Sequence, residues 1–169
     1  MVLAHKTKQV KILKKQKKRI SQLKQKSTVS SIKQSMASIT SGQIHQCYIA
    51  EPNDQCPFYH IIISRINETT NTIISVTFMI NSYLTGVEDV YQMEDSIPSF
   101  YHLIDYNINE GILHLKQINP AIGKKFILLA ITHAKSCGYD PHPDYHSLKD
   151  VFFDIDETNT PNSTFEFGA

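Results

Sequence analysis

The sequence predicts an α+β fold in which a small antiparallel sheet, a hairpin plus one or more strands, is covered by two or three helices. Two runs rich in β-branched residues, 59–66 and 72–80, flank a polar loop and indicate the hairpin. An Asn-Pro pair at 119–120 precedes apolar residues at helical spacing. Charge separates a basic N-terminal arm and polar linker, 1–42, from one globular domain with a polar C-terminal tail, 43–169.

The charged residues are segregated along the chain. Positions 1–33 contain eleven Lys and Arg residues and no Asp or Glu, whereas positions 34–169 contain sixteen acids and six bases. The formal net charge of +1 therefore hides a basic segment followed by an acidic one. Because such a density of like charge does not enter a core, we expect the arm to be flexible, or helical on binding.

The composition of the arm suits an anionic partner. Residues 6–26 contain neither Gly nor Pro and carry a thin apolar stripe at roughly helical spacing. A solvated tail is one interpretation, and a helix that contacts RNA or a ribosome is another, since phosphates favour clustered Lys regardless of sequence. The stripe lacks Trp and Phe, which disfavours membrane-surface binding. The predicted contact residues are Lys11, Lys14, Lys15, Lys17, Lys18 and Arg19.

Cysteine usage and hydropathy favour a cytoplasmic protein. The three cysteines leave one thiol unpaired under any pairing, and none has the spacing of a CxxC motif or a zinc site. The longest apolar runs, such as 126–131, are far shorter than the roughly 18 residues of a membrane span. The positively charged start is not followed by the apolar segment of a secretory signal, so we expect no membrane partner.

Three strands are expected in the sheet. Residues 44–50 add a third strand to the hairpin. In the second strand of the hairpin, Ser75 and Thr77 alternate with apolar residues, which predicts one core face and one partly wet face. Gly86 is expected to end the sheet, and residues 88–95 are expected to form an acidic loop.

Three helices are expected after the sheet. The first spans 97–107, and the second begins after its cap Asn119 and ends before Gly138. The third spans 144–153, with Asp144 as its cap. The apolar spacing of the second helix predicts the buried stripe Ile122, Phe126, Leu129 and His133.

A distinctive pattern follows the second helix. Residues 138–145 read Gly-Tyr-Asp-Pro-His-Pro-Asp-Tyr, and residues 153–156 read Phe-Asp-Ile-Asp. Together with residues 78–89, this pattern resembles an uncharacterised bacterial family whose members read GFxPHPDY, then GDID, then FxFG, and have a basic N-terminus. The chain departs from that family in having Glu88 where a Lys is usual. The resemblance implies one continuous domain over 44–168 and no particular activity.

The Pro-His-Pro-Asp-Tyr turn is rich in residue types that bind divalent metals. The residues of this possible functional turn are Asp140, His142, Asp144, Tyr145, His146, Asp154 and Asp156. His142, Asp144 and His146 are the candidate metal ligands, and a metal-dependent hydrolase or nuclease is the alternative function. The structural interpretation is that Pro141 and Pro143 stiffen a tight connection, Asp144 caps a helix and Tyr145 packs.

A further alternative is an acetyltransferase-like enzyme. The strand-like residues 113–118 and the helix after them superficially resemble the strand, phosphate loop and helix that bind acetyl-coenzyme A. That chemistry requires several backbone N–H groups directed at a pyrophosphate. Here the only glycine is Gly123, and Pro120 removes one donor. We therefore expect no cofactor.

The function that the sequence favours is a non-enzymatic, cytosolic binding protein. Its Lys-rich arm is expected to dock on RNA, a ribonucleoprotein or another acidic partner. The acidic domain is expected to repel nucleic acid everywhere except at the arm, which restricts how the protein binds.

Deletion of residues 1–38 is expected to leave the stability of the domain nearly unchanged, because the charges of the arm do not enter a core. Thermal melting of the full-length and truncated proteins, followed by circular dichroism, measures the difference. A loss of more than about 2 kcal/mol, a large fraction of the stability of a domain, would contradict this expectation.

Overall fold

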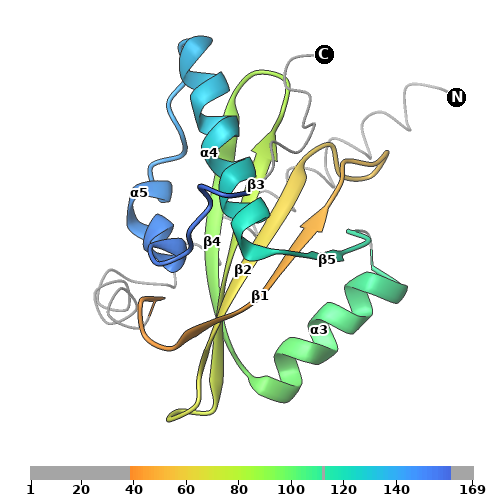
Figure 1. Cartoon of the computed structure of the whole chain (residues 1–169). Coiled ribbons are helices and arrows are strands. Elements are labelled where there is room, and N and C mark those ends of the chain that lie inside the picture. The colour runs from red at the N-terminus through yellow and green to blue at the C-terminus, as the bar shows by residue number, and fades with distance from the viewer. Residues whose placement is uncertain (1–38, 112, 161–169) are drawn as a thin grey trace, which may run out of the picture. The chain divides into compact units, whose positions relative to one another are not determined.

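The computed structural model describes residues 39–111 and 113–160, which contain one five-stranded antiparallel sheet with helices on both faces (Figure 1). The strand order is β4-β3-β2-β1-β5, so β4 and β5 are the edges of the sheet. The strands are β1 (Gln43–Ala50), β2 (Tyr59–Asn67), β3 (Thr72–Asn81), β4 (Gly86–Ser96) and β5 (Lys116–Ile118). The predicted α+β fold is confirmed.

The predicted hairpin is confirmed as β2 and β3. The two strands pair along their whole length, from Tyr59 opposite Ile80 to Asn67 opposite Thr72. Asn67 organises the connecting loop, because its side-chain oxygen accepts the N–H of Thr69 at 3.0 Å. The predicted third strand is also confirmed, as β1 pairs antiparallel with β2.

The prediction of an acidic loop over 88–95 is wrong, because these residues belong to β4. Val87 and Val90 are buried against the sheet, while Glu88 and Glu94 are exposed. An edge strand keeps one side in water, so it tolerates charges that a central strand would not, and those charges discourage pairing with another chain. The density of acids therefore indicated the solvated side of an edge strand rather than the end of the sheet.

One face of the sheet is covered by α4 (Pro120–Ser136), α5 (Tyr145–Leu148) and the 3₁₀ turn η1 (Lys149–Phe152) (Figure 1). The predicted start of α4 is confirmed, since the Asn119 side chain accepts the N–H of Ala121 at 2.8 Å. The aromatic ring of Phe78 packs against Phe152 at 5.7 Å between ring centroids. This face holds the larger of two buried apolar clusters.

The stripe predicted for α4 is largely wrong. Of its four residues only Phe126 is buried, whereas His133 is partly exposed and its imidazole lies 3.2 Å from the carbonyl oxygen of Tyr83. The helix lies close to β1 at Gly123, since a Cβ atom at this position would lie 2.5 Å from the sulfur of Cys47. The buried residues of α4 are Gly123, Phe126, Ile127, Ala130, Ile131 and Ala134.

The opposite face is covered by α3 (Ile97–Asn109), which confirms the predicted first helix. Its residues Phe100 and Ile104 are buried with apolar residues of β1, β2 and β3. The expectation of a partly wet face is wrong at its centre, since Ser75 and Thr77 are each only 4% exposed. Both faces of the sheet are therefore covered.

A buried arginine on β2 connects three distant parts of the chain. Arg65 is 1% exposed, and its Nε atom donates to the carbonyl oxygen of Val151 at 2.8 Å. One terminal nitrogen donates to the carbonyl oxygen of Gly42 at 2.8 Å, and the other pairs with the Asp154 carboxylate. The guanidinium carbon lies 5.0 Å from the centre of the Phe153 ring. Arg65 thus fixes the segment after η1 and the residue before β1.

Arg65→Met is expected to destabilise the domain by about 2 kcal/mol, because it leaves the carbonyl oxygen of buried Val151, and also that of exposed Gly42, without its donor. Asp154→Asn is expected to cost less than about 1 kcal/mol, since the Asp154 side chain is 43% exposed and the amide still accepts a hydrogen bond. Urea unfolding of each variant measures the loss. Equal losses for the two variants would show that the ion pair, and not the carbonyl bonds, dominates.

Candidate functional site

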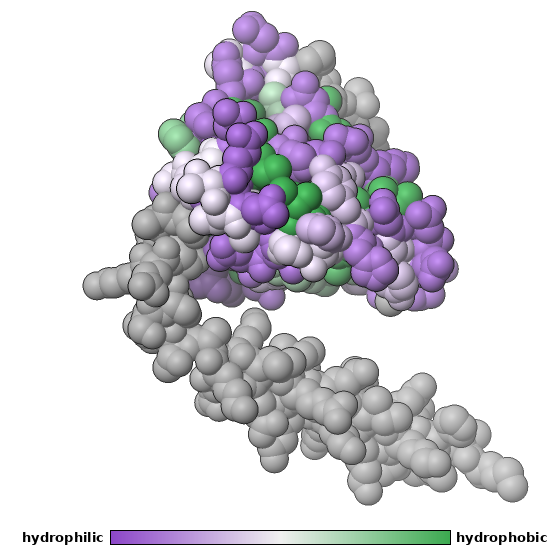
Figure 2. Space-filling model, turned by 90° about the horizontal axis from the view of Figure 1, so that it is seen from below, coloured by the Kyte–Doolittle hydropathy of each residue, from purple (hydrophilic) through white to green (hydrophobic). Residues whose placement is uncertain are grey.

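The predicted contact residues of the arm, 11–19, lie outside the described residues. The charges of the described domain bear on what that arm can bind. Residues 39–160 carry fifteen acids and six bases. The view in Figure 2 shows a mainly hydrophilic surface that is interrupted by a few apolar groups. An anionic ligand therefore meets an excess of negative charge on this part of the molecule.

Three of the six basic side chains of the described domain donate to carbonyl oxygens of that same domain. Arg65 is buried, as described above. The ammonium group of Lys124 donates to the carbonyl oxygen of Ile155 at 2.6 Å and pairs with the Glu157 carboxylate at 2.7 Å. The ammonium group of Lys125 donates to the carbonyl oxygen of Thr160 at 2.5 Å. Half of the positive charge of the described domain is thus used to fix its C-terminal segment.

The Pro-His-Pro-Asp-Tyr turn rests on the edge of the sheet. The backbone N–H of His142 donates to the carbonyl oxygen of Val87 in β4 at 2.9 Å. Tyr145 is 8% exposed and packs edge-on against Phe78, with 6.4 Å between ring centroids, which confirms its predicted packing role. The turn therefore has a fixed position relative to β4.

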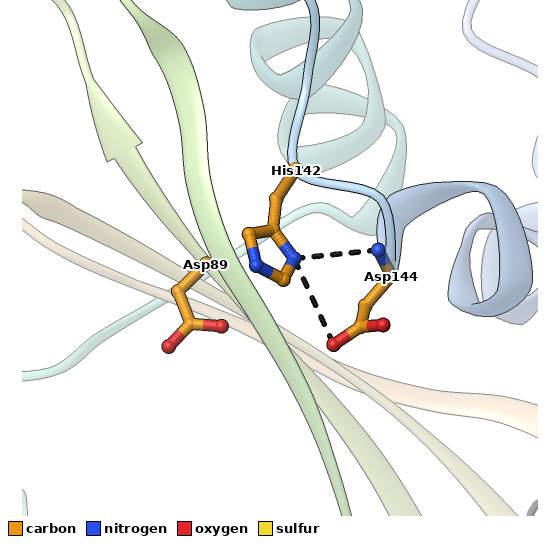
Figure 3. A group of neighbouring side chains, drawn as sticks. All are labelled: Asp89, His142 and Asp144. Atoms are coloured by element: carbon orange, nitrogen blue, oxygen red, sulfur yellow. Dashed lines mark hydrogen bonds and ion pairs between the residues drawn. The ribbon is translucent and has the colours of Figure 1, made fainter.

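The turn brings two predicted ligands together with a third, unpredicted residue (Figure 3). Asp89, His142 and Asp144 each offer a ligand atom within 4.8 Å of the other two. The Nδ1 atom of His142 lies 3.3 Å from the backbone nitrogen of Asp144 and 3.7 Å from its carboxylate. Asp89 lies on the other side of the imidazole ring. His146, the third predicted ligand, is exposed beside the Tyr145 ring and is not part of this group.

The remaining acids of the predicted turn lie apart from this group or have structural partners. Asp140 is exposed and is not a member of the group. Asp154 pairs with Arg65. Asp156 accepts the N–H and the hydroxyl of Thr158, at 2.9 and 2.7 Å, and these hydrogen bonds lower the pKa of the Asp156 carboxyl. The structure thus separates a compact group at 89, 142 and 144 from the acids that stabilise the C-terminal segment.

The predicted cap at Asp144 is wrong. Asp144 already has helical backbone angles, with φ −65° and ψ −18°, and its side chain makes no cap hydrogen bond to any described residue. An N-cap residue normally has extended backbone angles, which direct its side chain back to the first free N–H groups. The carboxylate of Asp144 lies beside His142 instead.

Two other pairs of side chains combine sulfur and imidazole. The sulfur of Cys56 lies 3.8 Å from Nδ1 of His60, and burial lowers the pKa of the His60 imidazole. The sulfur of Cys137 lies 3.9 Å from Nε2 of His133. Cys47 differs from both, because burial raises the pKa of its thiol to about 12. Cys56 and Cys137 are therefore the thiols that a soft metal could reach.

The start of α4 gives no support to an acetyl-coenzyme A site. The N–H groups of Ala121, Ile122 and Gly123 all donate to Asn119, through its side chain or its carbonyl oxygen. A phosphate at a helix start needs such groups to be free. These three donors are already used within the protein.

Asp144→Ala is expected to change the free energy of unfolding by less than about 0.5 kcal/mol, because the side chain is 63% exposed and caps no helix. Asn119→Ala is the matched comparison, and loss of its cap is expected to cost about 1 kcal/mol. Urea unfolding distinguishes the two. A loss at Asp144 as large as that at Asn119 would show a stabilising role for its carboxylate.

Among residues 39–111 and 113–160, no helix is long and apolar enough to cross a membrane. In comparisons with known proteins, no family model matches the chain, and the searches of curated proteins and of solved structures gave no match. The resemblance to an uncharacterised bacterial family therefore stays a prediction, and the function has to be argued from the residues of this chain.

Proposed function

We propose that the protein is a non-enzymatic binding protein that attaches to RNA through its Lys-rich N-terminal arm. The observation that carries this proposal is the separation of charge. Residues 1–33 contain eleven basic residues and no acidic one, while the described domain has fifteen acids and six bases. A polyanion therefore has one attractive segment on this chain.

The use of bases inside the domain supports this proposal. Arg65, Lys124 and Lys125 bond to carbonyl oxygens of the domain itself. Lys116 lies 3.2 Å from the carboxylate of Glu51. These bases are consequently poor anchors for phosphates. The acidic domain is expected to repel a polyanion over about 10 Å, the screening length at moderate salt, which leaves the arm as the attractive segment.

A cytoplasmic location is part of the same proposal. Cys47, Cys56 and Cys137 are all free thiols in the structure. Free thiols persist in reducing compartments such as the cytosol. An acidic protein surface is the competing partner, because it would also attract a cluster of Lys residues.

Replacing five arm residues by Gln is expected to flatten the salt dependence of RNA binding. Each phosphate contact to a single strand contributes a slope of about 0.7 in a plot of log affinity against log salt, so five lost contacts reduce the slope by roughly 3.5. Fluorescence anisotropy with single-stranded RNA of mixed sequence, over a series of KCl concentrations, measures this. The residues to replace are Lys14, Lys15, Lys17, Lys18 and Arg19.

The matched control replaces exposed bases of the domain. Lys116→Gln with Lys149→Gln removes positive charge outside the arm, and the salt dependence is expected to stay as in the wild type. Equal RNA binding by the five-residue variant would contradict the proposal. If the wild type bound no RNA but retained an acidic protein at low salt, the partner would be that protein.

A further inference from the structure

The group at 89, 142 and 144 lies where the turn meets the edge strand, and it is distinct from the proposed RNA-binding arm (Figure 3). We propose that Asp89, His142 and Asp144 bind a divalent transition-metal ion, Mn²⁺ or Zn²⁺. The proposal rests on where the backbone places these side chains and on the kinds of atom they offer.

A β-bulge sets the position of Asp89. In the pairing of β3 with β4, Met79 lies opposite Asp89 and Ile80 lies opposite Val87, so Glu88 is an extra residue. A bulge bends an edge strand locally and changes the direction of its side chains. The Asp89 carboxylate also accepts the N–H of Val90 at 2.9 Å, which restricts its rotation.

Backbone hydrogen bonds fix the other two residues. The N–H of His142 donates to the carbonyl oxygen of Val87, two residues before Asp89, at 2.9 Å. The carbonyl oxygen of His142 accepts the N–H of Tyr145 at 2.9 Å, and that of Asp144 accepts the N–H of Leu148 at 3.1 Å. The two segments that supply the group are therefore joined directly by their main chains.

The geometry requires only a small adjustment to hold an ion. Ligand atoms around tetrahedral zinc lie roughly 3.4 Å apart, since each is about 2.0–2.2 Å from the metal. The three side chains offer atoms within 4.8 Å of one another. The Asp144 side chain is 63% exposed and has room to rotate toward the other two. A shared cation would also relieve the repulsion between the carboxylates of Asp89 and Asp144.

The donor set decides the class of metal. Imidazole suits zinc and its neighbours among the transition metals, whereas carboxylates suit Mg²⁺, Ca²⁺ and Mn²⁺. One imidazole with two carboxylates therefore favours Mn²⁺ or Zn²⁺. Three protein ligands leave coordination positions for water, so the ion would remain accessible from solvent.

The test uses Mn²⁺, because zinc would also bind at the thiols of Cys56 and Cys137. Full-length protein is treated with a chelator, dialysed and titrated with Mn²⁺, and free Mn²⁺ is measured by electron paramagnetic resonance. The wild type is expected to bind one Mn²⁺ per chain. Asp89→Asn and His142→Gln are each expected to weaken that binding by about tenfold or more.

The controls lie in the same turn but outside the group. Asp140→Asn and His146→Ala are expected to leave Mn²⁺ affinity unchanged, since both residues are exposed and neither belongs to the group. Thermal melting of each metal-free variant shows whether it is folded. If Asp89→Asn or His142→Gln does not fold, Asp144→Asn is tested in its place. Absence of saturable binding would overturn the proposal, as would equal weakening by the controls, which would indicate diffuse attraction to the acidic surface.

Discussion

The burial of Arg65 is the constraint on which the rest of the structure depends. Removing a guanidinium from water is costly unless each of its nitrogens finds an acceptor. Arg65 meets this requirement with the carbonyl oxygens of Val151 and Gly42 and the carboxylate of Asp154. The segment that follows η1 must therefore lie against the sheet. Because the Pro-His-Pro-Asp-Tyr turn runs between α4 and this fixed segment, the positions of His142 and Asp144 also depend on Arg65.

Close contact between α4 and the sheet fixes the other end of the turn. At Gly123 the helix lies so near β1 that a Cβ atom would overlap the sulfur of Cys47, and at Gly86 a Cβ atom would lie 2.7 Å from that of Ala134. Such packing leaves α4 little freedom to slide or rotate. The turn is held at one end by this helix and at the other by Arg65. The backbone that carries His142 and Asp144 is therefore fixed, while the exposed Asp144 side chain keeps room to rotate.

The β2–β3 hairpin and the start of α4 are predictable from local signals, whereas the long-range contacts are not. The β-branched runs of β2 and β3 and the Asn119 cap act within a few residues, so a single sequence shows them. Arg65 reads as a surface charge, because its partners lie 86 and 89 residues away. Asp89 was missed for a similar reason, since the acids of β4 obscured the buried Val87 and Val90. That apolar pair was the available signal for the strand.

The pairing of β1 with β5 has a consequence for the folding rate. The strands β2, β3 and β4 are consecutive hairpins, but β5 joins β1 with Ile118 opposite Cys47, across most of the domain. Contacts this distant in sequence form only after a long loop has closed, and the entropy lost in that closure slows folding. Arg65 adds to this delay, because its guanidinium stays hydrated until the last segment arrives. An emerging chain would thus remain a partial sheet until β5 is synthesised, and Arg65 would lack its partners until residues 151–154 follow.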